Sequence, residues 1–213
     1  MNFGFFEILT LVGSLGFFIY GMKIMSEGIQ KLAGAKMRSV LGAITNNKFA
    51  GIFTGFFTTS IIQSSSATTV MIVSFVNAGI LSLRQAIGVI MGANIGTTVT
   101  AFLVLGLGFG KLSLATYALP LIALGLPLIF FKKDNFSSLG DFIIGFALLF
   151  MGLEALKASV PSFDQGGFYN FIEPLTNHGI FSVIIFVFVG TLVTILVQSS
   201  SAAMALTLVL CTK

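Results

Sequence analysis

The stretch Gln63-Ser64-Ser65-Ser66-Ala67 has four consecutive polar side chains, yet it lies inside a long apolar segment of the chain. The same five residues recur as Gln198-Ser199-Ser200-Ser201-Ala202, again in apolar sequence. The match extends upstream, at the same spacing, to two further pairs of residues: Gly55 with Gly190, and Thr59 with Thr194. Burying a polar side chain without a partner costs roughly 2–7 kcal/mol, so these residues need partners within the protein. A duplicated polar break in duplicated apolar segments predicts two structural repeats with a binding site between them.

The composition of the chain is that of an integral membrane protein. Of its 213 residues, 56% are hydrophobic and 8% are charged, whereas a soluble domain carries about 25% charged residues. A membrane-spanning helix needs about 20 apolar residues, and four uncharged stretches reach that length: 49–83, 85–110, 112–131 and 174–212. They show no alternation of apolar and polar positions, which speaks against a transmembrane β-barrel. We expect an all-α, multi-pass protein in the lipid bilayer of the cell (inner) membrane.

Three observations exclude other classes of protein. The net charge of +4 is spread too thinly over the chain for binding nucleic acid. The single cysteine, Cys211, can form neither an internal disulfide nor a cysteine-based metal site. The serines lie in no Gly-x-Ser-x-Gly motif, and the one histidine, His178, has no evident acidic partner. We therefore expect a protein that is not an enzyme and has no cofactor.

The apolar pattern predicts the order of the helices. Lysine and arginine cluster between the apolar segments, as the positive-inside rule expects. We expect a helix over 5–25, followed by a basic amphipathic stretch to residue 48. The next segment enters the membrane near 49 and breaks at 63–66, and a helix over 66–76 then ends in the turn Asn77-Ala78-Gly79. After Arg84 we expect a helix that is interrupted at 92–98, and then a span over 112–131 that Pro120 and Pro127 kink.

The chain divides at a basic loop into two repeats. We assign the first transmembrane repeat to residues 3–131, the loop to 132–137 and the second repeat to 138–213. The region after the first helix of repeat one (23–48) is basic, and the equivalent region of repeat two (154–178) is acidic. Under the positive-inside rule, this difference predicts repeats of inverted topology. Far fewer residues follow Gln198 than follow Gln63 within repeat one, so we expect repeat two to be incomplete, as in a truncated product or a fragment.

The polar breaks have the chemistry of an ion site. Gly55, Thr59 and Gln63 form one stripe of a helix that leads into the three serines. A new helix that begins at the serines would aim its N–H groups and positive dipole end at an anion. The carbonyl, hydroxyl and amide oxygens suit a hard cation such as sodium. Small residues also suit close packing of membrane helices, but the duplication with glutamine and the same Gly/Thr spacing favours a binding role.

The segment Gly92-Ala93-Asn94-Ile95-Gly96-Thr97-Thr98 is a second candidate break. Two glycines around Asn94 would loosen a helix, and Thr97 and Thr98 would expose oxygens. A pair of packing glycines explains the same pattern equally well. The residues alone do not choose between these interpretations.

These residues resemble one known family. The chain is similar to the type II sodium/phosphate cotransporters in their bacterial form. The similarity lies in the doubled Gln-Ser-Ser-Ser-Ala, in the segment 92–98 that follows its first copy, and in the neighbourhood of Gly21-Met22-Lys23 and Ser26-Glu27-Gly28. The resemblance covers nearly the whole chain and implies an inverted-repeat fold in which the two breaks face each other at the membrane midplane. Two features of the family are not found in these 213 residues: a second Asn-Ile-Gly-Thr-Thr-like segment with further helices, and the cytosolic helical domain of many bacterial relatives.

The resemblance also implies roles for individual residues. Phosphate would bind at Gln63, Ser64, Ser65 and Ser66 of the first copy and at Gln198, Ser199, Ser200 and Ser201 of the second. The coupling ion, Na⁺, would be held or supported by Thr59, Asn94, Thr97, Thr98 and Thr194. The implied function is sodium-driven import of inorganic phosphate by alternating access. Self-association or a missing C-terminal half would complete the transporter.

Two other functions fit the same sequence. The chain could be a truncated, non-transporting membrane protein, either a remnant or an assembly partner of a full-length relative. It could also be a sodium-coupled carrier of a different oxyanion with the same fold. Competition by sulfate or arsenate would separate this last function from phosphate transport.

Overall fold

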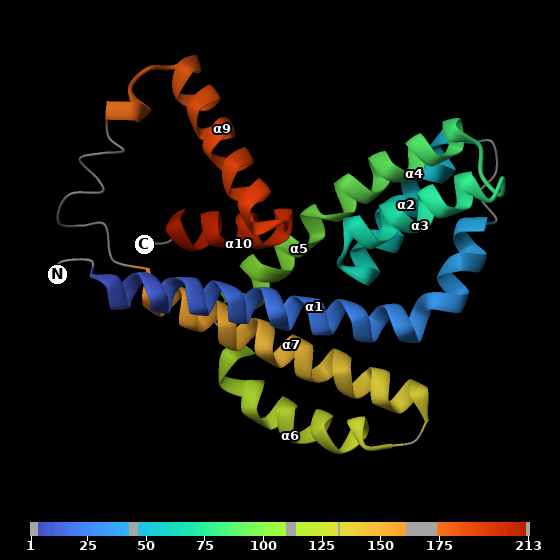
Figure 1. Ribbon diagram of the computed structural model, residues 1–213, viewed down its shortest axis with the longest axis horizontal. Coiled ribbons are helices and arrows are strands. Elements are labelled where there is room, and N and C mark those ends of the chain that lie inside the picture. The colour runs from blue at the N-terminus through green and yellow to red at the C-terminus, as the bar shows by residue number, and fades with distance from the viewer. Residues whose placement is uncertain (1–3, 43–46, 110–113, 132, 161–173, 212–213) are drawn as a thin grey trace.

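The computed structural model describes residues 4–42, 47–109, 114–131, 133–160 and 174–211, which form helices and, within these ranges, no strand (Figure 1). Four stretches of them are long and apolar enough to cross a membrane: Phe5–Gly34, Leu83–Gly108, Asp134–Ser159 and Ile180–Val197. The expected all-α membrane architecture is confirmed. The elements are α1 (Phe5–Gly42), α2 (Lys48–Ile62), α3 (Ser65–Asn77), α4 (Leu83–Gly96), α5 (Thr98–Leu103), the π-helix η1 (Val104–Gly108), the 3₁₀-helix η2 (Leu114–Tyr117), α6 (Ala118–Ile129), α7 (Asp134–Ser159), α9 (Ile180–Val197) and α10 (Ser200–Cys211).

The first helix is longer than the sequence predicted. We expected it to end near residue 25, but α1 continues without interruption to Gly42. The prediction was wrong because the basic residues end the apolar segment and not the helix. Glutamine, lysine, leucine and alanine at 30–33 are all strong helix formers. α1 therefore carries polar side chains on the same rigid rod as its apolar span.

Other predicted boundaries agree with the structure in part. The break at 63–66, the helix that follows it and the turn at Gly79 (φ 70°) are confirmed. The loop expected over 132–137 is shorter, because α7 begins at Asp134, whose carboxylate suits the positive end of a helix. The interruption within 92–98 is slight, since Thr97 keeps right-handed helical angles (φ −62°, ψ −27°). The span expected over 112–131 is divided between η2 and α6, with Pro127 inside α6, and residues 112 and 113 lie outside the described ranges.

α1 and α7 lie side by side and run in opposite directions (Figure 1). Glycines make this close approach possible. A Cβ at Gly21 of α1 would lie 2.4 Å from the Leu149 nitrogen, and a Cβ at Gly145 of α7 would lie 2.1 Å from the Met25 nitrogen. The same reciprocal relation links two further pairs: Gly28 with Phe142, and Gly152 with Phe18. Such a self-complementary antiparallel contact is what two equivalent helices of inverted topology produce.

α2, α3 and α4 form a unit in which α2 and α4 touch backbone to backbone. A Cβ at Gly55 would lie 2.0 Å from the Val89 carbonyl oxygen, and a Cβ at Gly92 would lie 1.9 Å from the Ile52 carbonyl oxygen. Gly96 meets α2 in the same way. Both glycines of the 92–98 segment are therefore packing glycines. The apolar centre of the unit consists of Ile62, Ile72, Leu81, Ala86 and Val89.

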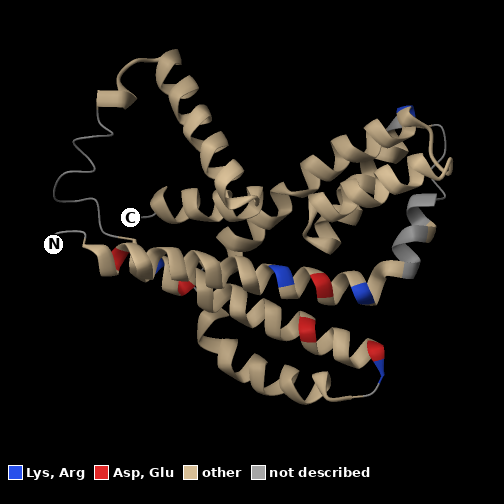
Figure 2. Cartoon of the chain, viewed as in Figure 1, with Lys and Arg blue, Asp and Glu red and all other residues tan. Residues whose placement is uncertain are grey.

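α9 and α10 form a second hairpin that resembles α2 and α3, but no described helix covers α9 as α4 covers α2. α10 packs on α1 and α7 through Ala202, Ala205 and Val209, which belong to the larger apolar core. Only 6% of the residues of α9 are buried. Apart from the neighbouring residues of α9 itself, no described atom lies within 4 Å of the place where Gly190 would carry a Cβ. Figure 2 shows no charged residue on α9 or α10. The outer face of α9 thus suits contact with lipid.

Candidate functional site

Each polar break is a sharp turn that a glutamine makes at the end of a helix. Gln63 ends α2 and Gln198 ends α9, both with a left-handed backbone (φ 58° and 56°). They are the only non-glycine residues with positive φ in the described part of the chain. Their backbone N–H groups donate to the carbonyls of Thr59 and Thr194 at 2.7 and 2.8 Å, and each Nε2 donates to the carbonyl three residues back at 2.6 Å. The glutamines thereby give hydrogen bonds to carbonyl groups at the ends of α2 and α9, where the membrane offers no water to do so.

The first serine after each glutamine caps the helix that follows. Ser64 Oγ accepts a hydrogen bond from the Ala67 N–H, and Ser199 Oγ accepts one from the Ala202 N–H, both at 3.2 Å. The N–H groups of the next two serines in each copy stand at the very start of the helix, where they have no partner inside it. A helix N-terminus carries about half an elementary positive charge. Both breaks therefore present the same anion-attracting end.

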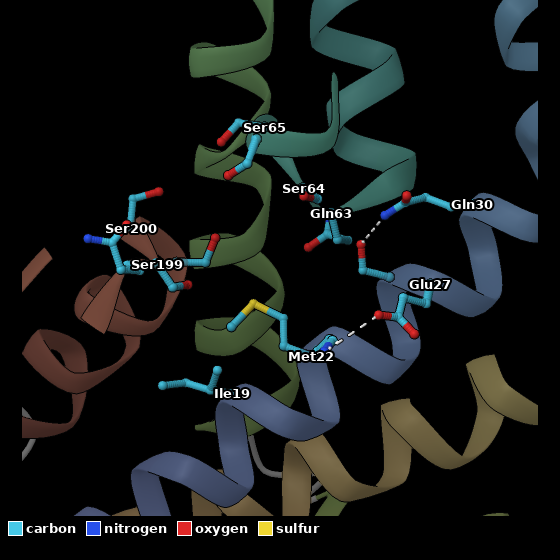
Figure 3. A pocket seen from close by; sticks show the side chains of 14 residues that line it. Ile19, Met22, Glu27, Gln30, Gln63, Ser64, Ser65, Ser199 and Ser200 are labelled. Carbon is cyan, nitrogen blue, oxygen red and sulfur yellow. Dashed lines mark hydrogen bonds and ion pairs between the residues drawn. The ribbon is translucent and has the colours of Figure 1, made fainter. Parts of the chain in front are cut away.

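The two breaks, far apart in the sequence, open into one cavity (Figure 3). Its volume is about 320 Å³, and its walls are Gln63–Ser66, Gln198–Ser201 and one face of α1. Figure 3 shows the serines of the first break on one side of this space and those of the second break across from them. All eight residues predicted to bind phosphate line the cavity. The structure thus brings two helix N-termini and their serine hydroxyls to the same space.

The third wall of the cavity is a stripe of α1 that was not predicted from the sequence to bind an ion. Its members recur every three or four residues, which places them on one face of the helix. Ser26 Oγ donates to the Ile62 carbonyl at 2.8 Å, and Gln30 Nε2 donates to Ser26 Oγ at 2.9 Å, so α1 is fastened to the end of α2. Polar and charged residues inside a membrane span face the protein interior or an aqueous cavity, and this signal could have identified the stripe. It consists of Ile19, Met22, Lys23, Ser26, Glu27 and Gln30.

The two glutamines have different surroundings. Gln63 is buried, and its Oε1 accepts a hydrogen bond from Thr100 Oγ1 of α5 at 2.9 Å. Gln198 is exposed, and among the described residues no group donates to its Oε1. The side chain of Gln63 is therefore held by a buried bond from a neighbouring helix, whereas that of Gln198 bonds, among the described residues, only within its own hairpin.

Thr100→Val removes the donor to Gln63 Oε1 and keeps the shape of the side chain. A buried acceptor left without a partner destabilises a fold by about 1–3 kcal/mol, and we expect that decrease in the free energy of unfolding. The control is Thr207→Val on α10, because the one bond that the Thr207 hydroxyl makes to a described residue is to the Ala203 carbonyl of its own helix, at 2.9 Å. We expect the control to change stability by no more than about 0.5 kcal/mol. Denaturant unfolding in detergent, followed by circular dichroism, measures both; an equal loss in the two variants would contradict the role of Thr100.

None of the five residues predicted to hold sodium lines this cavity. Thr59 is buried, and its hydroxyl donates to a threonine of α3 at 3.1 Å. Thr194 lines a separate open groove between α9 and α10. Thr97 and Thr98 donate to carbonyls of the preceding turn at 3.2 and 2.7 Å, and the Asn94 side chain is exposed. Two of the five therefore lie beside the breaks, and three lie at the junction of α4 and α5.

The chain is similar to phosphate transport proteins. The family model described as Na⁺/Pi-cotransporter matches residues 17–158, a range that includes the α1 stripe and the first break. The chain is 28% identical over 204 residues to the putative inorganic phosphate export protein YjbB of Escherichia coli (strain K12), covering 94% of the chain and 35% of that protein. It is 39% identical over 100 residues to sodium-dependent phosphate transport protein 2B of Homo sapiens (46% of the chain, 14% of that protein) and 40% identical over 97 residues to protein 2A of Rattus norvegicus (44% and 15%).

The chain spans about a third of the length of its Escherichia coli relative and less of the mammalian ones. No solved structure matches it. The matches, together with the four helices able to cross a bilayer, identify a multi-pass protein of the cell membrane, as the composition predicted. The chain belongs to the Na⁺/Pi-cotransporter family.

Proposed function

We propose that the chain forms the ion-binding part of a sodium-dependent carrier of inorganic phosphate, with phosphate held between Ser64–Ser66 and Ser199–Ser201. The observation that supports this most strongly is the single cavity into which both breaks open. Phosphate oxygens accept hydrogen bonds, and helix N-termini supply both N–H donors and a favourable potential for an anion. With a volume of about 320 Å³, the cavity accommodates the ion together with several water molecules, each of which occupies about 30 Å³.

The same breaks offer oxygens to the coupling cation. Where α2 and α9 end, the negative end of each helix dipole meets the positive end of the next helix. Thr59 and Thr194 supply hydroxyl and carbonyl oxygens at those negative ends, and we propose them as sodium ligands, with Asn94, Thr97 and Thr98 in support. A cation at one helix end and an anion at the next attract each other. Binding of sodium would therefore strengthen binding of phosphate.

The proposed transport mechanism is alternating access. The hairpins α2–α3 and α9–α10 belong to repeats of inverted topology. A change in their tilt relative to the α1–α7 pair would open the cavity to one side of the membrane or the other. The direction follows the gradients: sodium flowing into a cell would carry phosphate inward, and a steep outward phosphate gradient would reverse the flow. The Escherichia coli relative is named as an exporter, so both directions are to be measured.

The test uses the 213-residue chain in proteoliposomes, with radiolabelled phosphate on one side. We expect phosphate to move when a sodium gradient is imposed, and to stop when potassium replaces sodium or a sodium ionophore collapses the gradient. Phosphate movement that is equal in sodium and potassium would contradict sodium coupling. Phosphate binding is measured in parallel by calorimetry. Sodium-dependent binding without transport would favour an assembly partner. Sulfate or arsenate that binds more tightly than phosphate and displaces it would favour a carrier of another oxyanion.

A further inference from the structure

Two charged side chains line the cavity, and the proposed function gives them no role. Of the described residues around the cavity, Lys23 and Glu27 of α1 alone carry a charge. Both lie within the span Phe5–Gly34. Ionisable residues inside a membrane span are expensive, face a water-filled cavity or a partner, and mark the paths of ions. A lysine and a glutamate at this cavity therefore call for a functional explanation.

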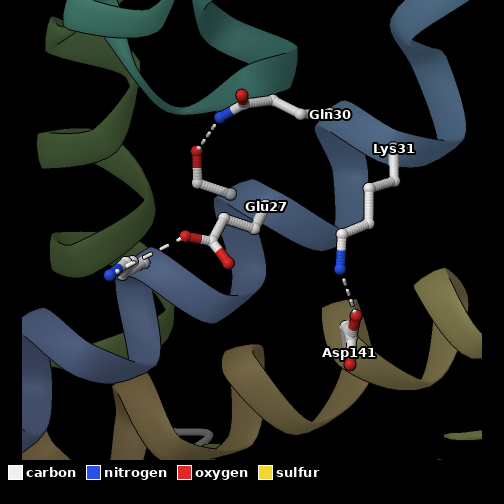
Figure 4. A network of polar contacts seen from close by, with 6 residues as sticks. Glu27, Gln30, Lys31 and Asp141 are labelled. Carbon is white, nitrogen blue, oxygen red and sulfur yellow. Dashed lines mark hydrogen bonds and ion pairs between the residues drawn. The ribbon is translucent and has the colours of Figure 1, made fainter.

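The ion pair between them is loosely made. Lys23 Nζ lies 3.9 Å from Glu27 Oε1, and the two side chains are 66% and 51% exposed. A lysine four residues before a glutamate is also the weaker orientation on a helix. Eight residues further along α1, Lys31 pairs with Asp141 of α7 at 3.0 Å (Figure 4). The Lys23 ammonium is thus much freer to take another partner than the Lys31 ammonium is.

The backbone that carries this pair is held firmly beside the first break. Ser26 and Gln30, on the same stripe, fasten α1 to the carbonyl of Ile62, the residue before Gln63. Figure 3 shows Glu27 and Met22 on the α1 side of the cavity, opposite the serines of the two breaks. The charged ends of Lys23 and Glu27 can therefore move while their Cα atoms keep their place at the cavity wall.

We propose that Lys23 and Glu27 exchange partners when the cavity is loaded. A phosphate oxygen replaces the Glu27 carboxylate at the Lys23 ammonium, and the released carboxylate takes a sodium ion inside the cavity, apart from the threonines proposed above. This step rests on the proposed function and adds two residues to it. Lysine is a common phosphate-binding residue, and carboxylate oxygens suit hard cations. Phosphate releases the Glu27 carboxylate so that it can bind sodium, and sodium keeps that carboxylate from competing with phosphate for Lys23. Each ion therefore strengthens the binding of the other.

The first test measures phosphate binding by calorimetry, at a series of sodium concentrations, on the full chain in nanodiscs. We expect Lys23→Gln to weaken phosphate binding at saturating sodium at least about tenfold, and Lys23→Arg to stay within about threefold of the original chain. Glu27→Gln should abolish the increase in phosphate affinity that sodium produces. Lys31→Gln removes one charge from the same helix away from the cavity, and it should bind both ions as the original chain does.

A second measurement needs no variant and therefore does not depend on how a variant folds. An amine-reactive reagent labels the lysines of the original chain, and mass spectrometry compares labelling rates with and without phosphate in the presence of sodium. We expect phosphate to slow the labelling of Lys23 several-fold and to leave Lys31 unchanged. If phosphate binds the original chain, any one of three results would overturn the proposal. These are unaltered labelling of Lys23, unaltered phosphate affinity in Lys23→Gln, and a full sodium response in Glu27→Gln. If the original chain binds no phosphate at all, the proposed function fails, and the exchange of partners fails with it.

Discussion

Gln63→Ala and Gln198→Ala are each expected to weaken sodium-dependent phosphate binding by about a hundredfold, or roughly 2.7 kcal/mol. Both glutamines line the cavity, and both hold a left-handed turn with a side-chain bond to the preceding helix. Left-handed geometry in a residue other than glycine is strained, and such strain gathers at functional sites. Without the amide, each break loses a polar group that lines the cavity, and the turn loses its side-chain bond to the preceding helix.

Stability should separate the two variants. Gln63→Ala also leaves the buried Thr100 hydroxyl without its partner, so we expect unfolding to become easier by about 2 kcal/mol. Within the described ranges no other helix makes such a bond to Gln198, and we expect Gln198→Ala to change stability by less than about 1 kcal/mol. Calorimetric binding and denaturant unfolding on the same preparations measure the two effects. Equal destabilisation would show that the difference in surroundings has no energetic weight.

Glycine variants distinguish the side chain from the backbone. Glycine adopts the left-handed conformation without strain, so Gln63→Gly and Gln198→Gly preserve the turn and remove only the amide. We expect them to bind phosphate as weakly as the alanine variants. Phosphate affinity at the level of the original chain in both glycine variants would mean that the glutamines act through the backbone alone, which would contradict their assignment as binding residues.

Gly55→Ala is expected to destabilise the chain by about 3 kcal/mol, whereas Gly190→Ala at the matching position of the second hairpin is tolerated. The new methyl group at residue 55 would lie 2.0 Å from the Val89 carbonyl oxygen. Two backbones would have to separate, and overpacking of this kind costs about 1–3 kcal/mol or more. At residue 190 no described residue outside the neighbouring part of α9 lies within 4 Å of the added Cβ, so the higher helix propensity of alanine should leave stability unchanged or raised by up to about 1 kcal/mol.

Thermal unfolding of Gly55→Ala and Gly190→Ala in the same detergent measures this difference. The comparison is controlled internally, because the two glycines precede the same Gln-Ser-Ser-Ser sequence at the same spacing. A loss of stability in Gly190→Ala as large as that in Gly55→Ala would show that some partner covers α9 in solution. Tolerance of both substitutions would contradict the close contact between α2 and α4.

Much of this architecture was predictable from the residues alone. The positions of the breaks followed from Gln63 and Gln198, because a run of polar side chains inside an apolar segment forces the helix to satisfy its ends locally. The end of α1 was not predictable from hydropathy, since the lysines beyond residue 25 change the polarity of the segment without lowering its helix propensity. The α1 wall of the cavity was missed for a related reason: a helix that ends near residue 25 separates Lys23 from Glu27, whereas α1 places both on one helix face. The role of Gly92 depended on a neighbour, Ile52, that only the tertiary structure identifies.

The antiparallel pairing of α1 with α7 also sets the order in which the chain can assemble. The contacts among α2, α3 and α4 join segments close in sequence, so they can form soon after Gly96 has been synthesised. The glycine-lined face of α1 has to wait until Asp134–Ser159 has entered the membrane, and the cavity waits still longer for Gln198–Ser201. The ion site is therefore among the last parts of the described structure to be completed during synthesis. A defect that slows insertion of α7 would leave a well-packed three-helix unit with only half of its binding residues in place.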